Sequence, residues 1–219
     1  MRDEIDFMVV GISKCGTTTL FEHLRRHPQI FIPKYKECPF NPGETKKEYM
    51  TRHFPKNYEG KIIGAVTPQW QRHYNLFKSW FPNAKVIMMV RDSNYRTASY
   101  IRMMNRMERP YDLDEINLTS DYFYWMEKWK QHFRIYAYKV DGLWYDDQRF
   151  MQMIYKILGV NSNFKSSSLG RIYNVGYDKP NLITKFCKRL PIRYLIPKSI
   201  KRRIWHLLEI KNKIKEIKK

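Results

Sequence analysis

The stretch that decides the fold reads Val9-Val10-Gly11-Ile12-Ser13-Lys14-Cys15-Gly16-Thr17-Thr18-Thr19-Leu20. It leaves an apolar run that begins at Phe7, and it enters a helical pattern with Leu20 and Leu24 on one face. A buried strand that passes through a tight, glycine-containing loop into a helix offers unpaired amides and the positive end of the helix dipole to an anion. The segment therefore predicts a phosphate-binding loop.

The loop departs from the pattern of nucleotide triphosphatases, G-x-x-x-x-G-K-[ST]. Gly11 and Gly16 have the right separation, but Thr17 stands in the place of the lysine, which lies inside the loop as Lys14. No later strand offers a convincing magnesium carboxylate, because Asp92 is directly beside an arginine. The pattern weakens a Mg-ATP kinase without excluding it. The residues expected to bind a nucleotide here are Ser13, Lys14, Cys15, Gly16, Thr17, Thr18 and Thr19.

Further apolar runs, nearly continuous rather than alternating, predict buried parallel strands. With the first strand they are 7–10, 62–66, 85–90 and 135–140, and the helical patterns between and after them are 17–27, 95–104, 120–133 and 146–158. Alternating strands and helices predict an α/β fold of the P-loop type, a three-layer sandwich with a central, mostly parallel sheet flanked by helices. In such folds ligands bind at the carboxyl ends of the strands. In the helix over 120–133, Phe123, Met126, Trp129 and Phe133 are expected to face the core, and Gly159 to end the last helix.

The length of 219 residues suits one domain, 1–219, with a basic helical tail over 197–219. The net charge of +20 favours anionic partners, and residues from Lys179 onward hold 14 Lys or Arg against two acids. We expect weak contact of this tail with an anionic membrane surface and no specific nucleic acid. Three cysteines without framework spacing, and no visible signal peptide, predict a cytoplasmic protein of a microbe or virus, peripheral to the membrane at most. Cys15 lacks the arginine six positions on that a phosphatase loop needs, so we interpret it as a structural thiol.

A second anion site is expected where the third strand ends, in Val90-Arg91-Asp92-Ser93-Asn94-Tyr95-Arg96-Thr97-Ala98-Ser99. Arg91 ends the strand and Ser99 lies about two turns into the next helix, so a guanidinium and a hydroxyl converge on one place. Together, the two segments resemble the sulfotransferases that use 3′-phosphoadenosine 5′-phosphosulfate (PAPS), in which an R-D-P-x-x-R-x-x-S pattern binds the 3′-phosphate. Arg91, Asp92, Arg96 and Ser99 match, and Ser93 replaces the proline.

The resemblance covers roughly residues 6–205 and implies further roles. Lys34-Tyr35-Lys36-Glu37-Cys38-Pro39-Phe40 is similar to the element that carries the catalytic glutamate in the branch of heparan-sulfate glucosaminyl sulfotransferases and bacterial relatives, which makes Glu37 the base. Val66-Thr67-Pro68-Gln69-Trp70 resembles an acceptor-side segment whose acid and lysine are replaced by Ala65 and Val66. The acceptor-binding candidates are Lys36, Thr67, Trp70, Arg72 and His73, and the resemblance adds Gly170 and Arg171 to the nucleotide site.

The resemblance implies sulfuryl transfer from PAPS, with 3′-phosphoadenosine 5′-phosphate (PAP) as product and no metal ion. Lys14 and Glu37 are the catalytic candidates, and the acceptor is expected to be a glycan, which a basic cleft would attract if it were anionic. Two alternatives stay open from the residues: a P-loop nucleotide kinase or NTPase, and a non-enzymatic polyanion-binding protein.

Overall fold

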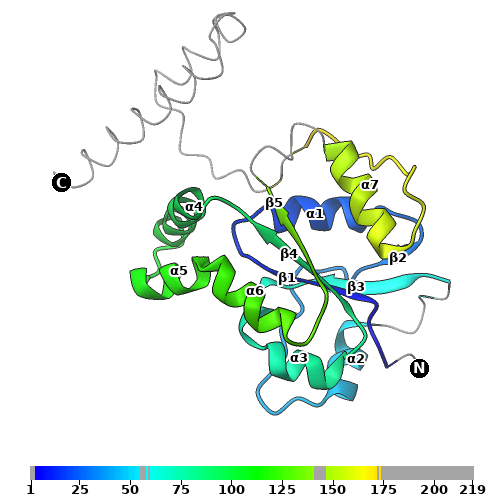
Figure 1. Cartoon of the computed structure of the whole chain (residues 1–219), viewed down its shortest axis with the longest axis horizontal. Coiled ribbons are helices and arrows are strands. Elements are labelled where there is room, and N and C mark those ends of the chain that lie inside the picture. Colours follow the sequence, from blue (N-terminus) through cyan, green and yellow to red (C-terminus); the bar gives the residue numbers. More distant parts are fainter. Residues whose placement is uncertain (1–2, 55–57, 59, 141–146, 172, 174–219) are drawn as a thin grey trace, which may run out of the picture. The chain divides into compact units, whose positions relative to one another are not determined.

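Five parallel strands form the central sheet in the order β2-β3-β1-β4-β5 (Figure 1). The strands are β1 (Phe7–Gly11), β2 (Ile30–Phe31), β3 (Ile62–Val66), β4 (Lys85–Val90) and β5 (Ile135–Lys139). The computed structural model describes residues 3–54, 58, 60–140, 147–171 and 173, all of which belong to one compact unit, Met1–Gly176. The expected tail over 197–219 lies outside the described residues.

The four strands expected from the sequence are confirmed within one residue at each end. Every residue of β1 is buried, which is why its sequence is continuously apolar: helices cover both faces of the sheet at this strand. The edge strand β2 was not predicted, because two residues carry no recognisable period.

Helices connect and follow the strands. They are α1 (Thr17–Leu24), α2 (Lys46–His53), η1 (Pro68–Arg72), α3 (Tyr74–Trp80), α4 (Ser93–Arg106), α5 (Leu113–Ser120), α6 (Tyr122–Lys130) and α7 (Asp147–Leu158). Three of them begin at an aspartate whose carboxylate accepts backbone amides of the first turn: Asp92, Asp112 and Asp121. The aspartate of the Arg91-Asp92 pair is therefore a helix cap.

The expected helices are present with shifted ends. The patterns over 17–27 and 120–133 are longer than α1 and α6, whereas α4 is longer than its pattern. The helices α2, α3 and α5 were not predicted from the sequence. Gly159, with φ of 76°, follows the end of α7, and its amide bonds to the Lys156 carbonyl, as expected of a helix-ending glycine.

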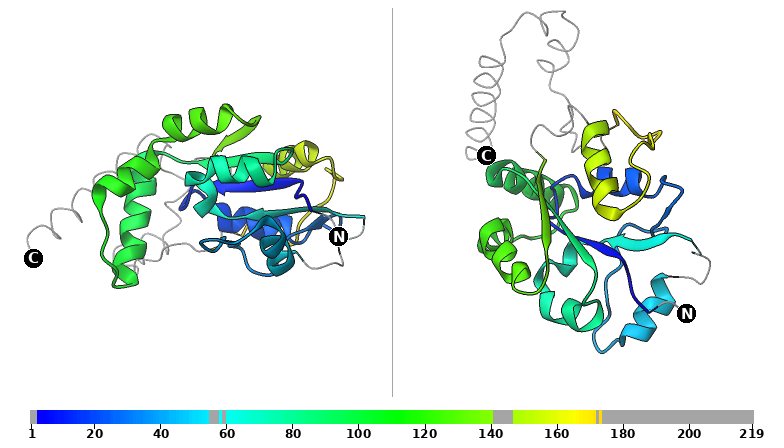
Figure 2. Two further views of the ribbon diagram at one scale, coloured as in Figure 1. Left: turned by 90° about the horizontal axis from the view of Figure 1, so that it is seen from below. Right: turned by 45° about the vertical axis from the view of Figure 1, so that its right-hand side comes forward.

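The helices form two layers around the sheet, so the predicted three-layer α/β fold is confirmed. Helices α1 and α7 lie on one side, and α3 and α6 on the other (Figures 1 and 2). Ring contacts agree with this arrangement: His27, after α1, lies 4.5 Å from Tyr155 of α7, and Phe77 of α3 lies 5.4 Å from Trp129 of α6.

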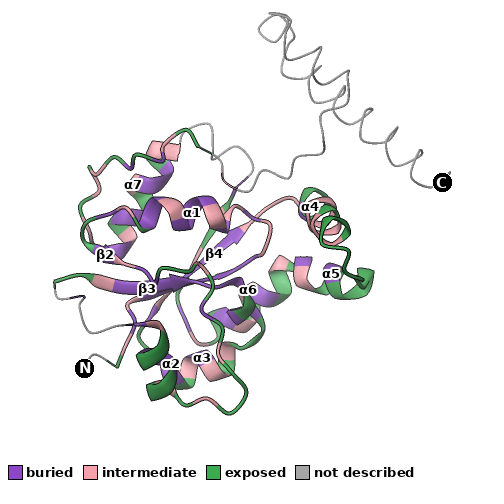
Figure 3. Cartoon of the chain, turned by 180° about the vertical axis from the view of Figure 1, so that it is seen from behind, coloured by how far each residue is buried: buried purple, intermediate pink, exposed green. Residues whose placement is uncertain are grey.

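The core prediction for α6 is correct for Trp129 and Phe133 and wrong for Phe123. Trp129 and Phe133 are buried, but Phe123 is 79% exposed, and Trp125 is buried instead. The helix ends at Lys130. Trp125 and Trp129 are four residues apart, so they share the face of α6 that packs against the core. Figure 3 shows the same contrast between buried central strands and exposed outer helix faces. No helix in the described part of the chain is long and apolar enough to cross a membrane.

Candidate active site

The predicted phosphate loop connects β1 to α1 at the carboxyl edge of the sheet. Lys14 and Gly16 both have left-handed backbone conformations, with φ of 70° and 76°. Gly16 is the N-cap of α1 and makes no side-chain cap hydrogen bond, so the amides of the first turn face out of the loop. Such a turn, at the positive end of a helix dipole, can hold an anion.

Lys14 projects from this loop toward α4. Its Nζ lies 3.6 Å from the Sδ atom of Met103. Partial burial, and then repulsion by neighbouring cations, lowers the pKa of Lys14 below its usual value; the cations are Arg106, Lys36, Arg102 and Arg91. The surroundings of Lys14 thus carry an excess of positive charge, which a polyanion would offset.

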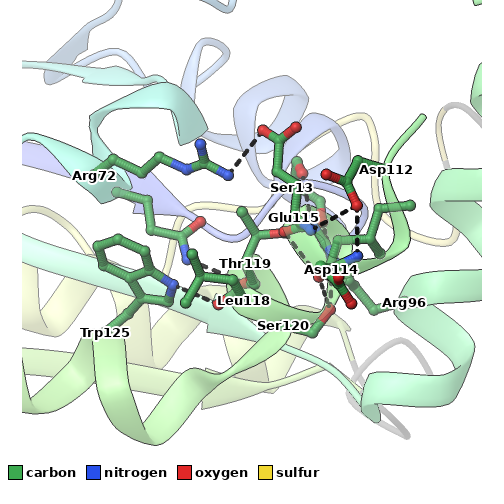
Figure 4. Close-up of polar contacts among 12 residues, drawn as sticks. Ser13, Arg72, Arg96, Asp112, Asp114, Glu115, Leu118, Thr119, Ser120 and Trp125 are labelled. Atoms are coloured by element: carbon green, nitrogen blue, oxygen red, sulfur yellow. Dashed lines mark hydrogen bonds and ion pairs between the residues drawn. The ribbon is translucent and has the colours of Figure 1, made fainter. Parts of the chain in front are cut away.

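Arg96 fastens the loop to the helices beyond it (Figure 4). Its side chain is 1% exposed, and its guanidinium donates to the Ser13 carbonyl at 3.3 Å, to the Ile116 carbonyl at 2.8 Å and to the Ser120 hydroxyl at 2.7 Å. The Ser13 hydroxyl lies 3.3 Å from the same guanidinium. Burial lowers the pKa of Arg96, and within the described residues its guanidinium forms no ion pair with a carboxylate. The Ser13 side chain, expected to face a nucleotide, is thus engaged with Arg96.

The second predicted anion site is at the end of β4. Arg91 follows the strand, and its guanidinium lies 5.6 Å from the centre of the Tyr95 ring. Ser99 is half-buried on α4. Because β1 and β4 are adjacent parallel strands, the loop after β1 and the segment after β4 lie at the same edge of the sheet.

Glu37 lies on the loop between β2 and α2. Its carboxylate accepts a hydrogen bond from Lys36 Nζ at 2.8 Å and a further one from the Gln69 amide. The Glu37 side chain is 42% exposed. Lys36 therefore interacts with both groups: its ammonium bonds to the Glu37 carboxylate, and its charge repels Lys14.

The peptide that follows Glu37 is held by buried side chains. The Cys38 amide donates to Thr67 Oγ1 at 3.0 Å, and the Cys38 carbonyl accepts from Tyr49 Oη at 3.0 Å and Trp70 Nε1 at 3.4 Å. Burial raises the pKa of the Cys38 thiol to about 12, so this thiol stays protonated. Thr67 and Trp70 therefore fix the backbone beside Glu37.

The predicted acceptor residues divide into a buried group and a group at the surface. Trp70 is 1% exposed among Phe40, Tyr49 and Phe77, so neither face of its indole is open to a sugar ring. Thr67 is fully buried. For these two residues the structure favours support of the Glu37 loop over contact with an acceptor.

Arg72, His73 and Lys36 are the acceptor candidates that reach the surface. Arg72 pairs with Glu115 at 3.0 Å, and both side chains are exposed (Figure 4). The His73 ring packs edge-on to Phe40, and partial burial followed by repulsion from Arg72 lowers its pKa.

The predicted Gly170-Arg171 segment lies against α1. The Tyr173 amide donates to Thr19 Oγ1 at 3.1 Å, and the Gly170 amide donates to Asp147 Oδ2 at 2.5 Å. Thr19 is fully buried, so its hydroxyl holds this segment rather than facing out of the loop. Arg171 is exposed next to these two anchors.

Two further loop residues are buried. Thr17 is 3% exposed in the first turn of α1, and the Cys15 thiol is fully buried, 4.0 Å from Tyr122 Oη. A buried position agrees with the interpretation of Cys15 as a structural thiol. Within the described residues, no group of three or more His, Cys, Asp or Glu side chains is placed to hold a metal ion.

Sequence reasoning did not single out Arg102, Arg106 or Gln69. The two arginines could have been found, because they follow Ser99 at helical spacing on a helix that begins beside Arg91. Gln69 could not, since its contact with Glu37 depends on how two distant loops meet.

The fold and the site together define a class: an α/β protein of the P-loop type with a cluster of cationic side chains at the carboxyl edge of its sheet. The sulfotransferase domain family matches residues 4–161, more than half of the chain. The chain therefore belongs to the sulfotransferase family, and the predicted family and enzyme class are confirmed.

Known relatives agree with this membership. Over 102 residues the chain is 35% identical to the membrane-associated sulfotransferase kil1 of Dictyostelium discoideum, an alignment of 43% of this chain and 22% of that protein. The chain thus corresponds to less than a quarter of the length of this relative.

Two solved structures share the fold. A sulfotransferase from Alicyclobacillus acidocaldarius superposes with a TM-score of 0.65 at 19% identity, over 75% of this chain and 85% of that one. The sulfotransferase domain from the curacin biosynthetic pathway gives a TM-score of 0.57 at 13% identity, over 75% and 76%.

Proposed function

We propose that this protein transfers a sulfuryl group from PAPS to a hydroxyl or amine of a carbohydrate and releases PAP. One observation carries the proposal: Lys14, on the loop after β1, is half-buried with its Nζ 3.6 Å from Met103 of α4, and burial together with repulsion by neighbouring cations lowers its pKa. Charges of one sign that face each other in a partly buried site favour the binding of a multiply charged anion. PAPS, with two phosphates and a sulfate, is such an anion.

The donor would be held from both motifs. The first-turn amides of α1 and the hydroxyls of Thr17 and Thr18 would hold the 5′-phosphate, and Arg91, Ser99 and Arg171 the 3′-phosphate. Lys14 would donate to the oxygen between sulfur and the 5′-phosphate, where negative charge collects as that bond breaks.

Glu37 would act as the base. The acceptor oxygen or nitrogen forms the new bond to sulfur, and its proton passes to the Glu37 carboxylate. The contacts with Lys36 and Gln69, and the anchored Cys38 peptide, support the role because they hold an exposed carboxylate in one orientation. A metal ion is not needed for these steps.

The proposal extends to the acceptor and to the cellular location. A carbohydrate suits the resemblance of the Glu37 element, with Lys36, Arg72 and His73 as contacts. We also propose a cytoplasmic location with peripheral contact to an anionic membrane surface through the basic tail. The word membrane-associated in the name of the Dictyostelium relative is in line with such contact.

Nucleotide binding tests the donor assignment. The melting temperature would be measured with PAP, with AMP and with Mg-ATP. A ligand at a hundred times its dissociation constant stabilises the fold by about 2.7 kcal/mol. We expect PAP alone to raise the melting temperature strongly. A response to Mg-ATP and not to PAP would favour the kinase, and no response to any nucleotide would favour a polyanion binder.

Turnover of Glu37→Gln tests the base. Loss of proton abstraction should lower kcat by about 10²- to 10⁴-fold, while the PAP-induced rise in melting temperature stays at the wild-type value. Glu127→Gln is the matched control, because Glu127 is an exposed carboxylate on α6 that also pairs with a lysine. Wild-type turnover in Glu37→Gln would contradict the assignment.

A further inference from the structure

One face of α4 is turned toward the phosphate loop, and two contacts identify it. The Arg96 guanidinium reaches Ser13, and Met103 Sδ lies 3.6 Å from Lys14 Nζ. Arg96 and Met103 are seven residues apart, which is two turns of an α-helix and about 10 Å along its axis. The stripe of α4 that contains them therefore follows the loop for that distance.

Ser99 and Arg106 belong to the same stripe. They lie three residues after Arg96 and three after Met103, and residues three or four apart share a helix face. Arg102 follows Ser99 by three residues and precedes Arg106 by four, so it borders the stripe. Along α4 the order is Ser99, then Met103 beside Lys14, then Arg106 about one turn beyond.

This order has a chemical meaning, given the proposed function. Ser99 would bind the 3′-phosphate, and the sulfuryl group would lie beside Lys14. The next turn of α4 lies past the sulfuryl group, on the side from which an acceptor must approach.

The two arginines have free charges in the described part of the chain. Neither forms a hydrogen bond or ion pair with another described residue, and both are exposed. Two acids of α5 and its N-cap, which packs on α4, are engaged elsewhere: Glu115 pairs with Arg72, and Asp112 Oδ1 accepts from the amides of Asp114 and Glu115 (Figure 4). Repulsion from both arginines reaches Lys14, which agrees with their position on the loop-facing side.

We propose that Arg102 and Arg106 form an acceptor subsite that binds an anionic group, so that the acceptor carries a carboxylate, sulfate or phosphate near the hydroxyl or amine that receives the sulfuryl group. The inference rests on the proposed function and adds the substrate class and the residues that select it. Lys36 is a further cation whose charge acts on Lys14, and it would contribute to the same preference.

The test compares Arg102→Gln/Arg106→Gln with a control that loses equal charge elsewhere. Arg134→Gln/Lys47→Gln removes two exposed cations near the amino edge of the sheet. Arg134 directly precedes β5, and Lys47 follows Lys46, which pairs with Glu4 before β1. All substituted side chains are exposed, so both variants should keep the wild-type melting temperature without ligand.

PAP binding is measured first, as the rise in melting temperature. We expect equal rises in the wild type and both variants. A wild type that does not respond to PAP refutes the proposed function, and the inference with it, before any saccharide is added. Loss of the response in Arg102→Gln/Arg106→Gln alone would place these arginines in the donor site and overturn the inference.

Calorimetric titration of the PAP-saturated proteins follows. The probes are a chondroitin-type tetrasaccharide with its glucuronate carboxylates and the same tetrasaccharide after carboxyl reduction. A charge-assisted contact should make the wild type bind the acidic probe about tenfold more tightly, or more. The preference should disappear in Arg102→Gln/Arg106→Gln and remain in the control. No preference in the wild type, or an undiminished one in the double variant, overturns the proposal.

Discussion

Lys14 combines a left-handed backbone with a partly buried, repelled ammonium group. A residue in such a position destabilises the free protein, and a bound anion offsets this by neutralising its charge. Its side chain nevertheless has a defined neighbour, because Nζ lies against Met103.

Lys14→Met should therefore separate function from stability. We expect turnover to fall by about 10²- to 10³-fold and the PAP-induced rise in melting temperature to shrink, because the charge at the leaving oxygen is lost. The melting temperature without ligand should not fall, since the variant removes repulsion. Lys47→Met, on the exposed face of α2, is the control and should change neither quantity. A lower melting temperature with an unchanged PAP response would contradict this account.

Thr67 acts at the same scale through one hydrogen bond. Its hydroxyl accepts from the buried Cys38 amide beside Glu37. Thr67→Val should leave that amide without a partner and lower the free energy of unfolding by about 1–3 kcal/mol. It should also reduce kcat by releasing the Glu37 loop, while Thr67→Ser, which keeps the hydroxyl, restores both.

Urea denaturation and steady-state kinetics measure these two effects. If Thr67→Val loses stability but keeps the wild-type kcat, the hydroxyl supports the fold and does not orient Glu37.

Among the elements, α4 connects the most parts of the site. It begins at Asp92 beside Arg91, contacts the loop through Arg96 and Met103, and packs on α5. Arg96 is the link between these elements, since one guanidinium bonds to the loop and to α5 at once.

Arg96→Gln should disturb both sides of this link. We expect the free energy of unfolding to fall by about 1–3 kcal/mol, because buried carbonyls lose their donor. PAP affinity should fall as well, because the peptide that precedes Lys14 is no longer held. Arg109→Gln, an exposed arginine just beyond α4, is the control. Unfolding and PAP titrations would be run on the same samples, and unchanged PAP affinity in a destabilised variant would limit Arg96 to a structural role.

At the scale of the molecule, the contact between α1 and α7 buries two histidines. His23 is fully buried with neither ring nitrogen hydrogen-bonded, and Asp147 lies 4.0 Å away. His27 accepts from the Gln29 amide and lies 3.0 Å from the Asn161 carbonyl. Burial is the main cause that lowers the pKa of both, although Asp147 and Glu22 oppose it at His23.

Stability should therefore fall as the pH drops below about 6.5, the usual pKa of histidine in an unfolded chain. The unfolded chain takes up protons that the folded protein resists, so the unfolding free energy decreases, by up to about 1.4 kcal/mol per pH unit for each histidine. The loss should continue until the pH reaches the lowered pKa of the folded state. His23→Met should flatten this dependence, and His132→Gln, on a half-exposed histidine beside Tyr74, should not. Urea unfolding at pH 7.5 and 5.5 measures the change in unfolding free energy between the two pH values. An equal change in His23→Met and in the wild type would contradict the prediction.

Much of the architecture was predictable because its signals are local. Continuous apolar runs marked β1, β3 and β4, since strands covered on both faces have no polar alternation, and the run at 135–140 marked the edge strand β5 although none of its residues is fully buried. The loop after β1 was recognised from its glycine spacing between a strand and a helix, and the Arg91–Ser99 segment from its resemblance to the sulfotransferase pattern. A strand that ends in glycine before a helix, and an arginine at the end of a strand, are consequences of neighbouring residues.

Only the tertiary structure decided which side chains meet. It buried Trp70 and exposed Phe123, joined Gln69 to Glu37, and placed Arg96 between Ser13 and Ser120. It also brought the cations of three separate segments to Lys14. These outcomes depend on contacts between residues far apart in the chain, such as Ser13 and Arg96, which are 83 positions apart, and such contacts leave no period in the sequence. The sequence alone determined four of the strands and the glycine-containing loop after β1, whereas packing determined how the surroundings of that loop are charged and held.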